Sequence, residues 1–286
     1  MGNGILLGKG VCIGSTYNIH KPPGDQVTTV FSTIESQRVR EVNAKRKTIS
    51  VDFTLRMRWL DQRIGIDKIR MHNGRGIGLS PNALNKIWTP DVHIQNRASF
   101  KIHDEWYSMV NARIMTLDET NQIKSTKDEI ATGVELTYEI KDSVHCEFDY
   151  SNYPMDKQTC RLGLGSRSSD TKFKLYDRDR RFHNTCNYKE VNFNITVNFL
   201  NLPLEGSSII GMNIQMTRLR NSYLMEYYIP CIGIILVSEI GFVVPVTAIP
   251  GRIGLLVTQF LTLINLFIHQ MVIYFNNFFL SRINSY

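Results

Sequence analysis

The charged residues of this chain are distributed so unevenly that they divide it into two physically different parts. The 286 residues include 33 Lys+Arg and 26 Asp+Glu, and only four of these lie after Arg220: Glu226, Glu239, Arg252 and Arg282. An apolar content of 43% excludes a disordered chain. We therefore predict a soluble N-terminal domain followed by a membrane part.

Two apolar segments in the C-terminal part are long enough to cross a bilayer. The first runs from Tyr227 to Val246 with Glu239 as its one charge, and the second, Ile253 to Ser281, has no Asp, Glu, Lys or Arg. A helix needs roughly 20 apolar residues to span the hydrocarbon core. Two prolines and Gly251 lie between the segments and predict a helix break and a turn.

Polar side chains recur at helical spacing in the second apolar segment. Thr258, Thr262, Asn265 and His269 follow one another at steps of four, four and three residues, and so fall along one stripe of a helix. Such a stripe lines a water-filled path or forms a packing seam with another helix. The stripe alone favours neither interpretation.

The N-terminal part has the alternating pattern of half-buried β-strands. Apolar and polar residues alternate, and clusters of Gly, Pro, Asn and Asp separate the alternating segments, which are Ile49–Trp59, Val134–Ile140, Val191–Phe199 and Ile210–Met216. With several such strands and no convincing amphipathic helix, we predict an antiparallel, immunoglobulin-like β-sandwich. Asn194 begins an Asn-Ile-Thr sequon on the polar face of its strand and is a candidate glycosylation site.

Two classes of function lack sequence support. The net charge of +7 comes from scattered Lys and Arg with no aromatic interleaving, so we expect no nucleic-acid partner. The seven His residues lack metal-ligand spacing, and no nucleophile or phosphate-loop motif occurs. We therefore expect no enzyme activity, no cofactor and no metal site.

The five cysteines leave the disulfide pattern open when spacing alone is considered. Cys231 lies inside the first apolar segment and is predicted to be a free, buried thiol. Cys146 and Cys160 are spaced to close a loop, which would contribute about 3 kcal/mol by the chain-entropy estimate. Connectivity cannot be deduced from sequence, and whether Cys12 and Cys186 pair is left open.

The content of that loop resembles the signature of a known family. Cys146–Cys160 reads CEFDYSNYPMDKQTC, with an aromatic-Pro-x-Asp core and a Gln before the closing Cys. Three further motifs agree in order: Trp59-x-Asp61-x-Arg63, the IWTPD of Ile87–Asp91, and Arg218 followed by Tyr228-Ile229-Pro230. Over about residues 25 to 270 the chain thus resembles the Cys-loop, or pentameric ligand-gated, ion channels.

The resemblance implies a subunit of a homo- or hetero-pentameric neurotransmitter-type channel in the plasma membrane. Residues 1–222 would form an extracellular ligand-binding sandwich and residues 223–286 a membrane region in contact with lipid, with a first span at about 225–246 and a pore helix at about 252–273. It also implies a Cys146–Cys160 disulfide. The residues expected to couple ligand binding to gating are Tyr153, Pro154, Asp156 and Arg218.

The resemblance further implies how the pore is built. Leu261 matches the family's central apolar gate, and a ring of leucines blocks ions by dewetting. Gly254, Thr258 and Asn265 would line the same path. Gly251 stands where cation-selective relatives place a Glu, next to Arg252, so the resemblance favours an anion-selective, chloride-conducting pore.

The expected ligand site departs from the aromatic box that binds amines in nicotinic relatives. Thr54, Gln95 and Arg167 stand at three of the wall positions, and Ser169 follows Arg167. Arg56 matches a position where amino-acid-gated relatives carry a ligand-binding Arg. The small-molecule agonist is therefore expected to be an amino acid or another anionic ligand. The alternative for both arginines is a structural role at the surface.

The C-terminus departs from the four-span pattern of the family. After the second apolar segment the sequence ends at Tyr286, so we expect the third and fourth spans to be absent. This allows a second hypothesis, in which the chain is a non-conducting subunit. Such a subunit would bind ligand, or co-assemble with full-length subunits and modulate them.

Overall fold

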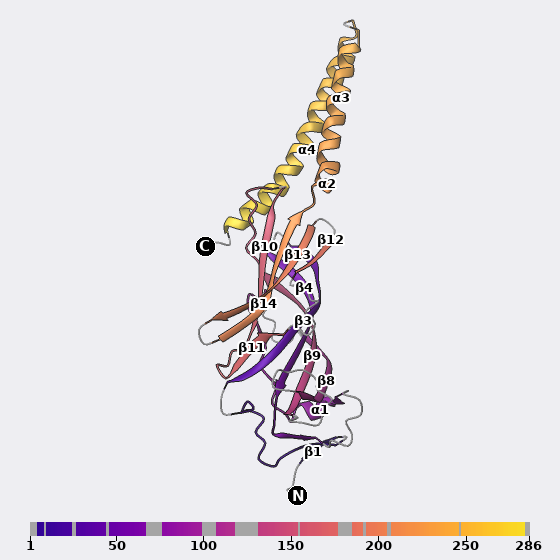
Figure 1. The fold of residues 1–286 in the computed structure, drawn as a ribbon. Coiled ribbons are helices and arrows are strands. Elements are labelled where there is room, and N and C mark those ends of the chain that lie inside the picture. The colour runs from indigo at the N-terminus through magenta and orange to yellow at the C-terminus, as the bar shows by residue number, and fades with distance from the viewer. Residues whose placement is uncertain are drawn as a thin grey trace.

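The molecule is elongated, with a β-sandwich at one end and a hairpin of two long helices projecting from it (Figure 1). The computed structural model describes residues 5–8, 10–24, 27–43, 46–66, 76–98, 107–117, 131–153, 155–176, 185–190, 193–204, 207–245 and 247–283. Strand β1 (Ile5–Gly8) lies at the end of the sandwich opposite the helices (Figure 1).

One sheet of the sandwich has six strands in the order β11-β3-β4-β9-β8-β6. Their bounds are β3 Thr28–Asn43, β4 Thr48–Leu60, β6 Ile77–Gly78, β8 Tyr107–Leu117, β9 Ala131–His145 and β11 Thr171–Leu175. All neighbours are antiparallel except β11, which pairs in parallel with β3. The sequence predicted an antiparallel sandwich, which is confirmed apart from this one edge.

The second sheet has five antiparallel strands in the order β12-β13-β14-β10-β7. Their bounds are β7 His93–Ile94, β10 Lys157–Gly165, β12 Thr185–Glu190, β13 Phe193–Leu204 and β14 Ser207–Arg218. A separate three-stranded sheet consists of β1 Ile5–Gly8, β2 Val11–Ile13 and β5 Ile64–Ile66, and the short helix α1 spans Pro81–Leu84.

The apolar faces of the two large sheets meet in one hydrophobic core. On β4 every second side chain points into it, and each of these is buried: Ile49, Val51, Phe53, Leu55, Met57 and Trp59. The predicted period-two strands are therefore confirmed, since Val134–Ile140 lies within β9 and Ile210–Met216 within β14. Of the Val191–Phe199 segment, residues 191 and 192 lie outside the described residues, and the rest belongs to β13.

The C-terminal part is helical and follows β14 directly. A helical turn, α2 (Arg220–Tyr223), leads through a π-helical turn, η2 (Leu224–Tyr228), into α3 (Ile229–Val243), and α4 covers Ile249–Ile283. The predicted break between the apolar segments is present between Val243 and Ile249. The part of α4 from Ile249 to His269 is apolar and long enough to cross a membrane, whereas α3 has 15 residues and is shorter than a typical span.

Candidate functional site

The loop between β9 and β10 is closed by a disulfide between Cys146 and Cys160, whose Cα atoms are 5.2 Å apart. The side chain of Gln158 organises the loop interior. Its Oε1 accepts from the backbone N–H of Asp149 at 2.8 Å, and its Nε2 donates to the Asp149 carbonyl at 2.6 Å. Gln158 is buried, so these hydrogen bonds are shielded from water.

The same loop carries a buried carboxylate. Asp156 is 1% exposed and accepts two hydrogen bonds from Arg218, from Nε at 2.6 Å and from Nη2 at 3.1 Å, and one from Gln158 Nε2 at 2.6 Å. Burial by itself raises the pKa of Asp156, but the hydrogen bonds from Arg218 and Gln158 and the positive charge of Arg218 outweigh it. The pKa is lowered, so the carboxylate is ionised at neutral pH.

Arg218 connects this loop to the helices. It is the last residue of β14, and α2 begins at Arg220. Its guanidinium lies 5.0 Å from the ring centre of Tyr153 and 4.7 Å from that of Phe193, which is the cation–π arrangement on two sides. Three of the four expected coupling residues are therefore in contact, and the fourth, Pro154, lies outside the described residues. Phe193 was not predicted, because nothing in its sequence context indicates this contact.

The two tryptophan motifs of the sequence meet in one network in the sandwich. Asp61 is fully buried and accepts from Arg63 Nε and Nη2, each at 2.9 Å, and from Tyr17 Oη at 2.9 Å. Tyr17 Oη in turn accepts from the backbone N–H of Trp88 at 2.9 Å, and Trp88 packs edge-on against Trp59. Tyr17 was missed by sequence reasoning because it lies far from both motifs in the chain.

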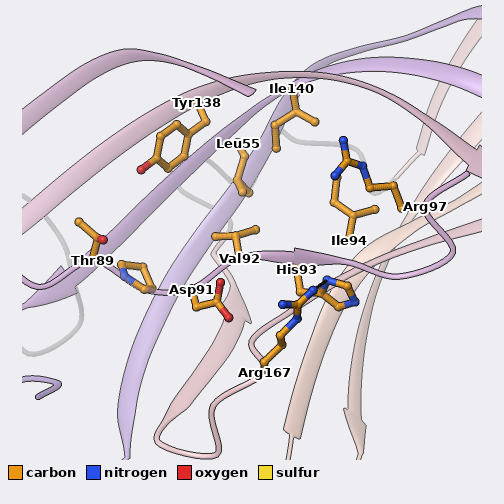
Figure 2. Close-up of a pocket in the computed structure, with 11 residues that line it drawn as sticks. Leu55, Thr89, Asp91, Val92, His93, Ile94, Arg97, Tyr138, Ile140 and Arg167 are labelled. Atoms are coloured by element: carbon orange, nitrogen blue, oxygen red, sulfur yellow. Dashed lines mark hydrogen bonds between the residues drawn. The ribbon is translucent and has the colours of Figure 1, made fainter. Parts of the chain in front are cut away.

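A cavity of about 480 Å³ opens between the two large sheets (Figure 2). Its apolar wall comes from β4 and β9, with Leu55 and Ile140 as examples. Its polar wall holds Asp91, His93 and Arg167, and Figure 2 shows the side chains of Arg167 and His93 together. Arg167 Nη2 lies 3.3 Å from His93 Nδ1. The cavity thus combines apolar surface with two guanidinium groups, those of Arg97 and Arg167, a mixture typical of small-molecule sites.

The five residues predicted to bind ligand lie in two groups, which a single chain does not bring together. Gln95 and Arg167 flank the pairing of β7 with β10, and Gln95 N–H donates to the Gly163 carbonyl at 2.8 Å. Ser169 follows on the same loop, is exposed, and donates from Oγ to Asp170 Oδ1 at 3.4 Å. Thr54 and Arg56 lie on β4 in the other sheet.

The β4 group faces away from the cavity. Leu55 lines the cavity, and side chains alternate along a strand, so Thr54 and Arg56 are on the opposite face. There Arg56 forms a two-pronged ion pair with Glu35 of β3, with distances of 3.1 Å from Nη1 to Oε1 and 3.1 Å from Nη2 to Oε2. The sequence did not predict this partner, because the strand register that brings Glu35 beside this part of β4 contains a bulge.

The residues predicted to line a pore lie on the surface of α4. Gly254, Thr258, Leu261 and Asn265 are all exposed, whereas Arg252, Leu255 and Gln259 are partly covered. Thr258 and Thr262 donate their hydroxyls to carbonyls of their own helix, so they do not join α4 to another helix. His269 differs, since its ring centre lies 6.4 Å from that of Tyr227.

The two remaining surface residues of interest lie where the sequence indicated. Asn194 is exposed on β13, opposite Lys189 and Thr217 in the sheet register. Gly251 is exposed in the first turn of α4. Cys231, predicted to be buried, is a free thiol of intermediate exposure on α3.

Comparison with known proteins defines the class to which this fold belongs. The family described as "Neurotransmitter-gated ion-channel ligand binding domain" matches residues 12–201. The chain therefore belongs to the neurotransmitter-gated, or Cys-loop, ion-channel family, a family of membrane proteins that are not enzymes. This confirms the resemblance seen in the sequence and the expectation that the chain has no catalytic role.

A particular relative is the gamma-aminobutyric acid receptor subunit pi of Bos taurus. It is 22% identical over 254 residues, an alignment that covers 86% of this chain and 53% of the relative. The chain thus spans about half the length of the curated relative it matches.

Proposed function

We propose that this chain is part of a subunit of a pentameric ligand-gated ion channel in the plasma membrane. The observation that carries this proposal is the buried Asp156–Arg218 pair, which joins the disulfide-closed loop to the residue at which the sandwich becomes helix. A charged pair between two rigid layers has two discrete arrangements, which is what a gating step requires. Residues 1–222 form the extracellular domain in this proposal, and residues 223–286 form the first two spans of a multi-pass membrane region.

The agonist in this proposal is an amino acid, bound between neighbouring subunits. One subunit contributes Gln95, Arg167 and Ser169, and its neighbour contributes Thr54 and Arg56. Glu35 compensates the charge of Arg56, so that face offers a cation and an anion side by side, which suits a zwitterion. Arg167 lies beside His93 and, among the described residues, forms no ion pair with a carboxylate, so its guanidinium is available to a ligand carboxylate. The name of the bovine relative, which specifies an amino-acid agonist, supports this ligand class.

The pore in this proposal selects anions and is lined by α4. Five copies of Arg252 at its start attract anions, and the neighbouring Gly251 places no carboxylate there. Thr258 and Asn265 line the path, and Leu261 forms the gate. Support comes from the exposure of Thr258, Leu261 and Asn265 on this helix.

Voltage clamp of cells expressing the chain tests the proposal, first alone and then together with the gamma-aminobutyric acid receptor subunit pi. Amino acids, with gamma-aminobutyric acid first, are expected to change the current, and acetylcholine is not. The reversal potential is expected to follow the chloride gradient. A current that appears only with the partner, or a partner current that this chain suppresses, identifies a modulatory subunit.

Two variants locate the agonist site. Arg167→Gln is expected to raise the half-maximal agonist concentration about tenfold or more, because one charge-assisted hydrogen bond is lost. Lys172→Gln, a matched change of an exposed cation on β11, is expected to leave that concentration unchanged. Equal effects of the two variants would exclude Arg167 from the site, and absence of any agonist effect in both expression conditions would refute the proposed function.

A further inference from the structure

A second cavity lies beside the disulfide, outside the proposed agonist site. Its volume is about 1150 Å³. Three parts of the chain meet around it: the turn between β3 and β4, the residue Asn96 after β7, and the first residues of the disulfide-closed loop together with the start of β10. The cavity shares no lining residue with the one between the sheets.

The wall of this cavity is strongly positive. Arg46, Lys47 and Arg161 contribute three permanent positive charges, and Glu147 is the one carboxylate in the wall. Elsewhere in the sandwich, arginines pair with carboxylates, as Arg56 does with Glu35. Among the described residues, by contrast, no carboxylate forms an ion pair with Arg46 or Arg161, and both are exposed. The cavity wall therefore holds two guanidinium groups that form no ion pair with a carboxylate among the described residues.

The backbone around the cavity is held in an unusual conformation. Lys47 and Asn96 have φ angles of 52° and 61°, and they are the two non-glycine residues with positive φ in the described part of the chain. Their carbonyls accept from consecutive amides, Cys146 N–H at 2.9 Å from Lys47 and His145 N–H at 2.7 Å from Asn96. Left-handed backbone at non-glycine residues is unfavourable, and such residues concentrate at functional sites.

We propose that this cavity is a binding site for a phosphate group with three terminal oxygens, carried by inorganic phosphate or by a lipid headgroup that bears a phosphate monoester. The two guanidinium groups without an ion pair decide the ligand class. A carboxylate has two oxygens, which a single guanidinium can occupy by paired hydrogen bonds, whereas a phosphate monoester has three terminal oxygens and carries about −1.5 to −2 at neutral pH. The guanidinium groups of Arg46 and Arg161 bind phosphate oxygens by paired hydrogen bonds, and Lys47 adds a third cation.

Phosphate in this site acts on the coupling loop directly. The two carbonyls that anchor the start of the loop belong to Lys47 and Asn96, and both residues line the site. A phosphate that holds these two turns in place also holds the amides of His145 and Cys146, and through the disulfide it holds Cys160. The site is thus positioned to modulate the loop that carries Asp156, and it shares no lining residue with the cavity that contains Arg167.

The test uses the full chain in nanodiscs of neutral phosphatidylcholine. Calorimetric titration with inorganic phosphate at constant ionic strength measures the affinity for the soluble anion. In a second preparation, phosphatidylinositol bisphosphate is added to the disc. Binding of the lipid headgroup is then measured by hydrogen exchange of the His145 and Cys146 amides. Slower exchange of these amides is expected with whichever source binds. Protection by inorganic phosphate identifies a soluble ligand, and protection only by the lipid identifies a headgroup.

Variants separate the site from general surface charge. Arg161→Gln is expected to weaken phosphate binding about tenfold or more, and Arg46→Gln together with Arg161→Gln to abolish it. Lys157→Gln is the matched control, because Lys157 is an exposed cation on the same strand and does not line the cavity. It is expected to change the affinity less than twofold.

Three results would overturn the proposal: no binding and no protection with either source, an unchanged affinity in Arg161→Gln, or an equal loss in Lys157→Gln. Wild-type hydrogen exchange alone decides the question if the arginine variants fail to fold. None of these readouts requires channel current, so failure here is distinguishable from failure of the proposed function.

Discussion

Replacement of Asp156 by Asn is the sharpest test of the loop that joins the sandwich to the helices. The native carboxylate accepts three hydrogen bonds, two from Arg218 and one from Gln158 Nε2. Asn has the same shape, but it has no charge and replaces one acceptor oxygen with a donor. That donor must face either Arg218 or Gln158, which are themselves donors at this site. The variant therefore loses an ion pair and sets two N–H donors against each other.

The magnitude follows from the burial of the two partners. Breaking a buried ion pair by removing one partner costs about 3–5 kcal/mol, because the other charge stays uncompensated. Asp156 is 1% exposed, but Arg218 is 19% exposed, so water reaches part of the guanidinium. We therefore expect the free energy of unfolding to fall by about 3 kcal/mol, near the lower limit.

Urea unfolding of the full chain in detergent, followed by tryptophan fluorescence, measures this loss. Trp59 and Trp88 are buried in contact, with ring centres 5.7 Å apart, and report unfolding of the sandwich. Glu147→Asn is the matched control, since Glu147 is an exposed acid of the same loop, and it is expected to cost less than about 0.5 kcal/mol. Equal losses in the two variants, or a loss under about 1 kcal/mol in Asp156→Asn, would refute the reasoning.

The pH dependence supplies an independent check. The folded-state pKa of Asp156 is lowered below its usual range, so the stabilisation is fully present above the unfolded value of about 3.9. It is lost as the pH falls through the lower folded value. The difference in unfolding free energy between wild type and Asp156→Asn should be constant above about pH 5. Below about pH 4 this difference should become smaller as the pH falls. A difference that grows on acidification would contradict the assignment.

Three further predictions concern the sandwich. Gly211→Ala should destabilise it by about 2–3 kcal/mol in urea unfolding, because a Cβ there meets a backbone carbonyl of β10. Gly78→Ala is the control and should change the stability little, because the space around Gly78 is open. Replacement of both Cys146 and Cys160 by Ser should cost about 3 kcal/mol in the same assay, the entropy of the opened loop, and an unchanged midpoint would refute this. Tyr17→Phe should lower stability by about 1–3 kcal/mol, because it leaves a buried backbone N–H without its acceptor, and a neutral effect on the melting temperature would contradict that role.

Much of the fold could be predicted from the sequence because the signals are local. The alternation in Ile49–Trp59 places the apolar side chains on one face of a strand, whichever strands it pairs with. All of these apolar side chains are buried in the core. The apolar run after Arg220 is helical in the structure, and the break between the helices, from Val243 to Ile249, contains Pro245, whereas Pro250 is the second residue of α4. The motif between Cys146 and Cys160 carried enough fixed positions to indicate both the family and the disulfide.

The interactions that matter for function depend on register and on contacts between distant segments. Arg56 is readable as a candidate ligand-binding residue, yet only the pairing of β3 with β4 reveals Glu35 beside it. Asp156 and Arg218 were each expected to take part in coupling, but their hydrogen bonds required the pairing of β10 with β14. A bulge or a one-residue shift changes such partners, and no local pattern encodes it.

By itself, the sequence determined four of the strands, the apolar character of the two C-terminal helices, and the loop that indicates the family. These properties depend on the order of apolar and polar side chains within short segments of the chain, so they can be read without knowing which segments are in contact. The tertiary structure alone decided which charges are compensated, as for Arg56, and which form no ion pair within the described part of the chain, as for Arg46 and Arg161. Compensation depends on the distance between groups far apart in the chain, because the energy of a charge in a protein is set by its surroundings in space.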